Sequence, residues 1–359
     1  RIMDFIRITK RDNLSRKKEI LITLLAIVLS IVFAGIILLI FGLNPFEIFK
    51  EIIMGSVGTG LRVKQTIVKA VPLIITSMGI IVAFKMKFWN IGAEGQITMG
   101  ALGASWVALN LSPNLPQPVM LLLMMVGAAV CGGIWAFIPA IFKAKLGTNE
   151  TIFTLMMNYV AIKFVTYLQY GPWMDPAANG FPKIAMFPDN AVMPKLGGVN
   201  IGWILAILAA AFVYFFMNYT KKGYEITVVG ESIETARYAG MNISRIIVVA
   251  MLISGGLCGI TGMIQASAIE KTLVYGIANG YGFTAIITAW LSKLNAGYAV
   301  AVCAVFAMLI QGGQYIQIAL GVPSAVSDIV QGLILFFVLG SEFFMRYRVH
   351  IGRNSKEVA

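Results

Sequence analysis

Residues 88–96 place polar side chains in the middle of a strongly apolar stretch of the chain. Asn90 and Gln96 contribute amides, and Glu94 contributes a carboxylate. In a membrane these groups are costly unless they pair with protein groups or face water, so an embedded Glu is a candidate functional residue. The pattern predicts a break in a membrane-crossing helix. A polar solute could be hydrogen-bonded there, or an ion could be bound. Glu94 could equally cap a half-helix or mark a hinge.

A second, glycine-rich break at residues 276–282 precedes a short apolar segment at 281–291, which contains Phe283 and Trp290. At about 1.5 Å per residue, this segment covers only about half of a roughly 30 Å hydrocarbon core. Interrupted helices at corresponding positions in the two halves of a chain are typical of a transport pathway near the middle of the membrane. The alternative is a pair of re-entrant packing elements without solute contact.

Three polar residues surround the start of another apolar segment. Asn149 and Glu150 stand immediately before residues 151–170, and Asn158 follows two turns later. A side-chain acceptor and a negative charge both favour the start of a helix, so Asn149 and Glu150 are predicted to cap it. All three are also candidates for the lining of the pathway.

A polar stripe is predicted near the end of the chain. Ser324, Asp328 and Gln331 follow one another at spacings of four and three, which places them on one face of a helix. Such a stripe either lines a water-filled cavity or hydrogen-bonds a neighbouring helix. Asp328 and Gln331 are therefore further pathway candidates.

The composition determines the fold class. Of the 359 residues, 58% are hydrophobic and 12% are charged. A spanning helix needs about 20 mainly apolar residues, so the chain is predicted to be an all-α polytopic membrane protein with about ten transmembrane helices and no sizeable soluble domain. The first five predicted segments are 20–42, 66–84, 96–111, 119–142 and 151–170. The second five are 201–219, 246–266, 281–291, 296–311 and 322–340.

An odd number of crossings in each half predicts two inverted five-helix repeats, because the second half then begins on the opposite face. We divide the chain into a basic N-terminal segment, a transmembrane domain and a tail, at residues 1–19, 20–340 and 341–359. Within the transmembrane domain, the repeats cover about 20–170 and 201–340, an extracytoplasmic loop covers about 171–200, and a cytoplasmic loop covers 221–245.

Basic residues predict the orientation. Most of the 28 Lys and Arg residues fall in segments that this scheme places in the cytoplasm, including both ends of the chain. Both termini are therefore expected to be cytoplasmic. The net charge of +12 is explained by membrane orientation and contact with anionic lipid rather than by nucleic-acid binding.

The sequence does not point to a metal site or to an enzyme. The three cysteines lie in apolar segments without metal-ligand spacing, and the one histidine, His350, lies in the predicted tail. No nucleophile, base and orienting group are evident together. An ion-coupled transporter that uses Glu94 or Asp328 is the main alternative class.

The cytoplasmic loop contains a predicted short helix. Ser232 is suited to cap it, Glu234 lies in its first turn, and Gly240 can end it. A short amphipathic helix between two crossings could dock into a groove on a cytoplasmic partner, or it could lie on the lipid headgroups.

Two sets of residues carry a resemblance to a known family. One set resembles the coupling-helix region of permeases in the branched-chain amino acid, ribose and nucleoside group of ABC importers. It begins at Gly223, Tyr224 and Glu225 and ends at Met241. The resemblance implies that the residues within it that contact the ATPase subunit are Gly230, Glu231, Ser232, Glu234, Ala236, Arg237, Tyr238, Ala239 and Gly240. The other set, residues 88–96, 147–151 and 157–159, resembles the larger of two permease subunits in bacterial purine-nucleoside importers.

The resemblance implies a type II ABC importer fold in the bacterial cytoplasmic membrane. It implies a second, related permease, a cytoplasmic ATPase with two nucleotide-binding cassettes, and a lipid-anchored substrate-binding protein. No cofactor is expected to bind this chain directly. Its sequence lacks a Gly-x-x-x-x-Gly-Lys-Ser/Thr loop, so ATP would be hydrolysed by the partner.

The implied cargo is a nucleoside, which is uncharged and combines a hydroxyl-rich sugar with a flat base. Amides and aromatic faces suit such a solute better than fixed charge does. Asn90, Gln96, Asn158, Phe283 and Trp290 are of the right types. Simple sugars such as ribose are the nearest competing cargo.

Overall fold

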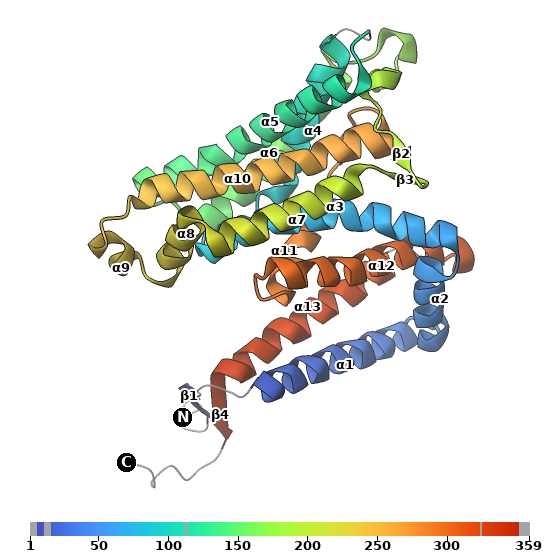
Figure 1. Ribbon diagram of the computed structural model, residues 1–359. Helices are drawn as coiled ribbons and strands as arrows, with labels where there is room; N and C mark the ends of the chain where they lie inside the picture. The colour runs from blue at the N-terminus through green and yellow to red at the C-terminus, as the bar shows by residue number, and fades with distance from the viewer. Residues whose placement is uncertain (1–5, 11–15, 112–113, 324, 352–359) are drawn as a thin grey trace. The chain divides into compact units, whose positions relative to one another are not determined.

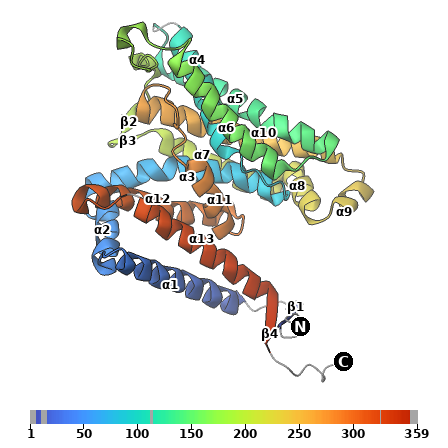
Figure 2. The same cartoon turned by 180° about the vertical axis from the view of Figure 1, so that it is seen from behind.

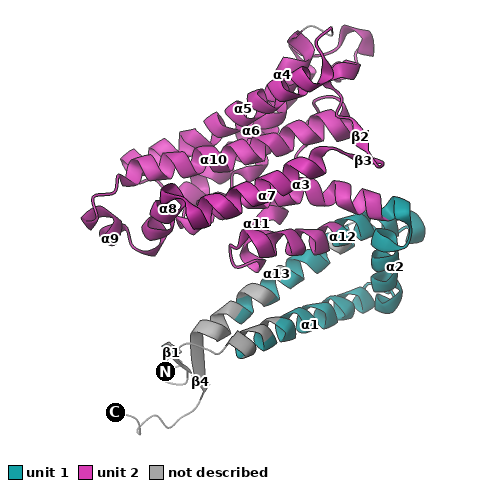
Figure 3. Cartoon of the chain, viewed as in Figure 1, with its two compact units in different colours: residues 1–62, 308–359 teal, residues 63–307 magenta. Residues whose placement is uncertain are grey.

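The computed structural model describes residues 6–10, 16–111, 114–323 and 325–351, and most of these are helical (Figure 1). The chain divides into two compact units (Figure 3). Unit 1 consists of residues 1–62 and 308–359, and unit 2 consists of residues 63–307. Both predicted breaks lie in unit 2.

Unit 2 contains the long helices that surround the two breaks. In chain order it is built from α3 (Gly60–Lys85, which begins in unit 1), α4 (Ala93–Asn110), α5 (Gln117–Leu146), α6 (Glu150–Tyr170), η1 (Pro176–Ala178), η2 (Asp189–Ala191), β2 (Lys195–Leu196), β3 (Val199–Asn200), α7 (Gly202–Tyr219), α8 (Lys221–Glu231), α9 (Ile233–Tyr238), α10 (Ile243–Ile264), the π-helical turn η3 (Gln265–Glu270), α11 (Tyr281–Leu291) and the first part of α12 (Ala296–Leu320).

The core of unit 2 is the packing of α4 and α5 against α10, which lie side by side in both views (Figures 1 and 2). Glycines allow this close approach. A Cβ atom added to Gly100 would collide with the backbone of Gly259, and one added to Gly255 would collide with Ala136 and Gly132. Small residues at helix contacts let membrane helices gain van der Waals packing along their backbones, where the hydrophobic effect contributes little.

Unit 1 contains the two ends of the described chain. It consists of β1 (Ile6–Lys10), α1 (Arg16–Ile40), α2 (Pro45–Val57), the last part of α12, α13 (Ala325–Arg346) and β4 (Tyr347–Ile351). β1 and β4 pair in antiparallel fashion, with Ile6 opposite Ile351. This pairing and that of β2 with β3 are the strand pairings among the described residues.

Helix α2 was not predicted from the sequence, which indicated a segment at 20–42 and no further element before residue 66. The structure shows a bend of 116° between α1 and α2. Gly42 has φ +73°, and the Asn44 side chain accepts a hydrogen bond of 3.1 Å from the Phe46 N–H, with Pro45 in the first turn. An Asn cap followed by Pro is a recognisable helix start.

The fold class predicted from the sequence, an all-α polytopic membrane protein, is confirmed. Six helices among the described residues are long and apolar enough to cross a membrane, or up to seven if the bent pair α1–α2 counts as one span. The count of about ten crossings stays a prediction. The short predicted segment at 281–291 coincides with α11, whereas α12 continues to Leu320, beyond its predicted end at residue 311.

Candidate functional site

The first break lies between α3 and α4. After α3 ends at Lys85, Lys87 has φ +57°, and the chain turns before α4 starts at Ala93. The Asn90 Oδ1 accepts a hydrogen bond of 3.0 Å from the Gly92 N–H and thereby holds this turn. Polar groups therefore replace the helical hydrogen bonds that are lost at the break.

Asn90 and Gln96 form a buried amide pair within this break. The Asn90 Nδ2 donates to the Gln96 Oε1 at 3.2 Å, and the Gln96 Nε2 donates to the Asn90 Oδ1 at 3.0 Å. The Asn90 Nδ2 also donates to the Ser254 Oγ on α10 at 3.1 Å. Both amides are buried, so their hydrogen bonds with each other offset the cost of removing them from water.

Side chains of helix α6 form hydrogen bonds with the backbone of the same break. The Asn158 Oδ1 accepts from the Gly95 N–H at 2.8 Å, and its Nδ2 donates to the Ile91 carbonyl at 2.8 Å. The Thr154 Oγ1 accepts from the Ile91 N–H at 3.2 Å. Two side chains one turn apart on α6 therefore satisfy backbone groups on both sides of the turn.

Glu94 joins the first break to the second. Its Oε1 accepts from the Gly280 N–H at 2.7 Å and its Oε2 accepts from the Gly282 N–H at 2.8 Å, so that the carboxylate caps the start of α11. A negative charge at a helix N-terminus satisfies free N–H groups and is favoured by the helix dipole. Gly280 has φ +75°, and a Cβ atom on Gly282 would collide with Glu94. We call this contact the Glu94 clamp.

An aromatic cluster lies beside the two breaks. Trp89, from the first break, stacks on Trp290 of α11 with ring centroids 5.3 Å apart, and Phe84 lies 5.3 Å from Trp89 and 6.0 Å from Trp290. Trp89 is 41% exposed, and Phe283, in the first turns of α11, is also exposed. The cluster of Phe84, Trp89 and Trp290 therefore offers accessible flat apolar surface next to the break.

Asn149 and Glu150 lie at the start of α6. Asn149 accepts hydrogen bonds from the Thr151 and Ile152 N–H groups, which confirms the predicted cap. Glu150 forms an ion pair of 2.7 Å with Lys143 at the end of α5. Lys143, Glu150 and Ser232 line a pocket of about 350 Å³, which connects the start of α6 to the loop between α8 and α9.

The short helix predicted after Ser232 is present as α9. The Ser232 Oγ accepts from the Thr235 N–H at 3.1 Å, and Gly240, with φ +72°, follows the helix end. Ala236 is buried, and Tyr238 is 98% exposed. The helix is therefore fixed on one side and presents Tyr238 outward.

Residues 221–231, which were predicted to belong to a cytoplasmic loop, form helix α8. The Thr220 Oγ1 caps it by accepting from the Gly223 N–H at 3.1 Å, and Ile226 and Val229 are buried on one face. At its end, a Cβ atom on Gly230 would collide with the Lys85 carbonyl, so α8 touches the end of α3. This close contact connects α8 to the edge of the first break.

Asp328 and Gln331 belong to unit 1. Asp328 is exposed in the first turn of α13, and Gln331 is buried one turn later. Ser324 lies outside the described residues. The structure therefore brings Asn90, Glu94, Gln96 and Asn158 together around the first break, and it places Glu150 in the pocket beside α8 and α9.

Sequence reasoning missed three residues of this arrangement. Thr154 and Ser254 hydrogen-bond the break from α6 and α10, and Trp89 forms the stacked pair. Trp89 stands beside Asn90 in the motif that was singled out, so its position was a usable signal. Thr154 and Ser254 are distant in sequence from the residues that they contact and lie in ordinary apolar helices.

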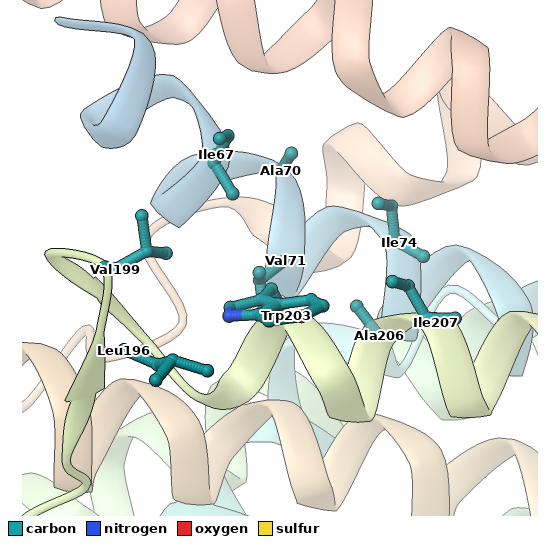
Figure 4. A pocket seen from close by; sticks show the side chains of 10 residues that line it. Ile67, Ala70, Val71, Ile74, Leu196, Val199, Trp203, Ala206 and Ile207 are labelled. Carbon is teal, nitrogen blue, oxygen red and sulfur yellow. The ribbon is translucent and has the colours of Figure 1, made fainter. Parts of the chain in front are cut away.

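A larger pocket of about 560 Å³ lies between α3, the β2–β3 turn and α7 (Figure 4). Trp203 projects into it, and its lining is apolar apart from the backbone and the indole N–H of Trp203. None of the predicted site residues lines this pocket.

Replacing Asn158 with Ala is expected to destabilise the break, because the Gly95 N–H and the Ile91 carbonyl would both lose a buried partner. Each buried group left unpaired costs about 1–3 kcal/mol. The thermal unfolding midpoint of the purified protein should fall, and transport should fall with it. Asn218→Ala is the matched control, since the exposed Asn218 side chain donates to the Tyr214 carbonyl of its own helix and to no other group among the described residues. Equal midpoints for the two variants would contradict this role of Asn158.

Known proteins resemble the chain over most of its length. It is 34% identical to a glucose ABC transporter permease protein of Haloferax volcanii, with 91% of this chain and 89% of the relative covered. It is 32% identical to a guanosine ABC transporter permease protein of Bacillus subtilis, over 91% of this chain and 94% of the relative. It is 29% identical to a nucleoside ABC transporter permease protein of Lactococcus lactis, over 90% of this chain and 92% of the relative.

A family described as branched-chain amino acid transport system / permease component matches residues 62–339. This range contains both breaks, the Glu94 clamp, the aromatic cluster and helix α9. The match covers well over half of the chain, and two of the relatives are more than 30% identical to it over most of their length. The chain therefore belongs to the permease components of the branched-chain amino acid transport system family.

Proposed function

We propose that this chain is one permease subunit of an ATP-driven importer and forms part of the pathway for nucleosides, in particular purine nucleosides. The observation that carries the proposal is the aromatic cluster beside the two breaks. A purine is flat and apolar, and aromatic side chains offer it stacking surface without fixed charge. The guanosine and nucleoside permeases similar to this chain support the same cargo.

The proposed contacts with cargo are Trp89, Phe283 and Trp290. Trp89 and Phe283 have exposed side chains, and Trp290 stacks on Trp89. Asn90, Gln96 and Asn158 are proposed as amides next to the path that could hydrogen-bond a sugar or a base. When cargo binds, these amides would replace their hydrogen bonds with the protein by hydrogen bonds with the cargo.

A simple-sugar permease is the second candidate, and a specific observation favours it. The glucose permease of Haloferax volcanii is at least as similar to this chain as the guanosine permease is. Sugars also pack their apolar faces on aromatic rings, so the aromatic cluster suits both cargoes.

The proposed coupling follows contacts within unit 2. ATP-driven closure of a partner ATPase with two nucleotide-binding cassettes would push on α9. Helix α8 would transmit the movement, because Gly230 touches the end of α3 at the edge of the first break. The Glu94 clamp then links α4 to α11, so both breaks would move together.

The remaining partners are proposed with the same function. A second, related permease would complete the pathway, and a lipid-anchored binding protein would deliver cargo. The complex would lie in the bacterial cytoplasmic membrane with both termini of this chain in the cytoplasm. Glu150, Asp328 and Gln331 are further proposed contacts with water or cargo in the pathway.

Uptake of labelled guanosine tests the cargo directly. Cells that lack this gene should lose high-affinity uptake, and restoring the gene should return it, because the aromatic cluster suits a purine base. The restored uptake should resist an excess of unlabelled glucose or ribose. Uptake of labelled glucose that returns with the gene, while guanosine uptake does not, would replace the nucleoside assignment with a sugar assignment.

Replacing Tyr238 with Ala tests the coupling. Tyr238 is almost fully exposed on α9, and a central Tyr at an interface commonly contributes enough that its loss weakens binding by about tenfold or more. Uptake and co-purification of the ATPase should both fall, while the amount of permease in the membrane stays the same. Tyr298→Ala is the matched control, since Tyr298 is exposed at the start of α12. An unchanged ATPase yield with Tyr238→Ala would contradict docking through α9.

A further inference from the structure

Helix α6 presents a stripe of exposed side chains that the described helices of unit 2 leave uncovered. The exposed side chains recur at helical spacings along one face, whereas Thr154, Asn158, Ala161 and Val165 are buried on the opposite face. We call this surface the α6 stripe. It consists of Ile152, Met156, Tyr159, Val160, Lys163, Phe164, Tyr167 and Tyr170.

Lys163 lies at the centre of the α6 stripe. Tyr159 precedes it by one turn and Tyr167 follows it by one turn, so the position of Lys163 lies between two tyrosines on an otherwise apolar and aromatic face. Because α6 runs from Glu150 to Tyr170, Lys163 is about 20 Å from one end of the helix and about 10 Å from the other. The residue is therefore well inside the membrane-spanning part.

Contact with lipid would be energetically costly for the charged Lys163 side chain. A long side chain could reach the nearer membrane surface only by extending toward the C-terminal end of α6. The Cα–Cβ bonds of a helix are tilted toward its N-terminus, which directs Lys163 toward the more distant end and the middle of the bilayer. Charged residues inside membrane spans instead face other protein groups or water.

The described part of this chain provides no ion-pair partner for Lys163. Its ion pairs join Lys143 to Glu150 and Lys222 to Glu225. Another Lys within a predicted span, Lys69 on α3, differs because it is partly buried and Glu270 is close enough to interact with its charge.

We propose that the α6 stripe is the surface that binds the second permease subunit, and that this partner places a carboxylate or carbonyl oxygen opposite Lys163. The inference rests on the proposed function, which requires a second permease. Tyrosine is favoured at protein interfaces because its ring packs and its hydroxyl still forms hydrogen bonds. The tyrosines around Lys163 would exclude lipid and strengthen the interaction of its charge with the acceptor.

The charge of Lys163 also distinguishes a related partner from a second copy of this chain. In a dimer of two copies about an axis along the membrane normal, the same surface would face itself. The two Lys163 side chains would then lie at the same depth, and two cations repel each other strongly in a medium of low dielectric constant. A non-identical permease can provide an acceptor at this depth, so the partner is a different chain of the same family.

Photo-crosslinking in the native membrane tests this proposal. The full chain would be produced in its own host with benzoylphenylalanine at residue 159 or 167, in place of the tyrosine. The control carries the same group at Leu208 of α7, whose exposed apolar face has no charged residue. The α6 variants should yield an adduct with a different chain that belongs to the same permease family, identified by mass spectrometry, and the Leu208 variant should not.

Several outcomes would overturn the proposal. These are adducts only with lipid, adducts with another copy of this chain or with residues 1–62 or 308–359 of the same copy, and an equal yield of permease adduct from Leu208. The test needs no transported solute, so a wrong cargo would leave its result unchanged.

A charge substitution provides a second measurement. Lys163→Glu should lower co-purification of the second permease by about tenfold or more, because it replaces the cation with a carboxylate that repels the acceptor oxygen. Lys163→Arg keeps the charge and should retain the complex. Equal co-purification with both variants would also overturn the proposal.

Discussion

The arrangement of the two breaks depends on one buried carboxylate. Glu94 accepts hydrogen bonds from the N–H groups of Gly280 and Gly282, and the shorter of these two sequence separations is 186 residues. An unpaired carboxylate at membrane depth and free N–H groups at a buried helix start are each costly. Pairing them satisfies both, and it fixes the start of α11 to the first turn of α4.

The other contacts hold that clamp in place. Asn158 of α6 binds backbone groups on both sides of the first break, and the amides of Asn90 and Gln96 pair inside it. The glycine-mediated packing of α10 against α4 and α5 provides a scaffold in which side chains have little room to shift.

Local features of the site were predictable from the sequence, and long-range pairings were not. The Ser232 and Asn149 caps and the short helix α11 depend on neighbouring residues, so their types and spacings identify them. Nothing local shows that Glu94 meets Gly280, since that contact requires the tertiary fold. Helix α8 was missed because its few buried residues lie between polar ones, although Thr220 is a usable capping signal.

The most direct test of the Glu94 clamp is amide hydrogen exchange of the purified, lipid-embedded protein and its Glu94→Ala variant. If the carboxylate caps α11, the amides of residues 280–283 should exchange faster in the variant, while those of α5 should not change. Glu150→Ala removes a carboxylate from a different helix start. In this variant the amides of residues 280–283 should exchange at the same rate as in the unmodified chain. Equal exchange at residues 280–283 with and without Glu94 would contradict the clamp.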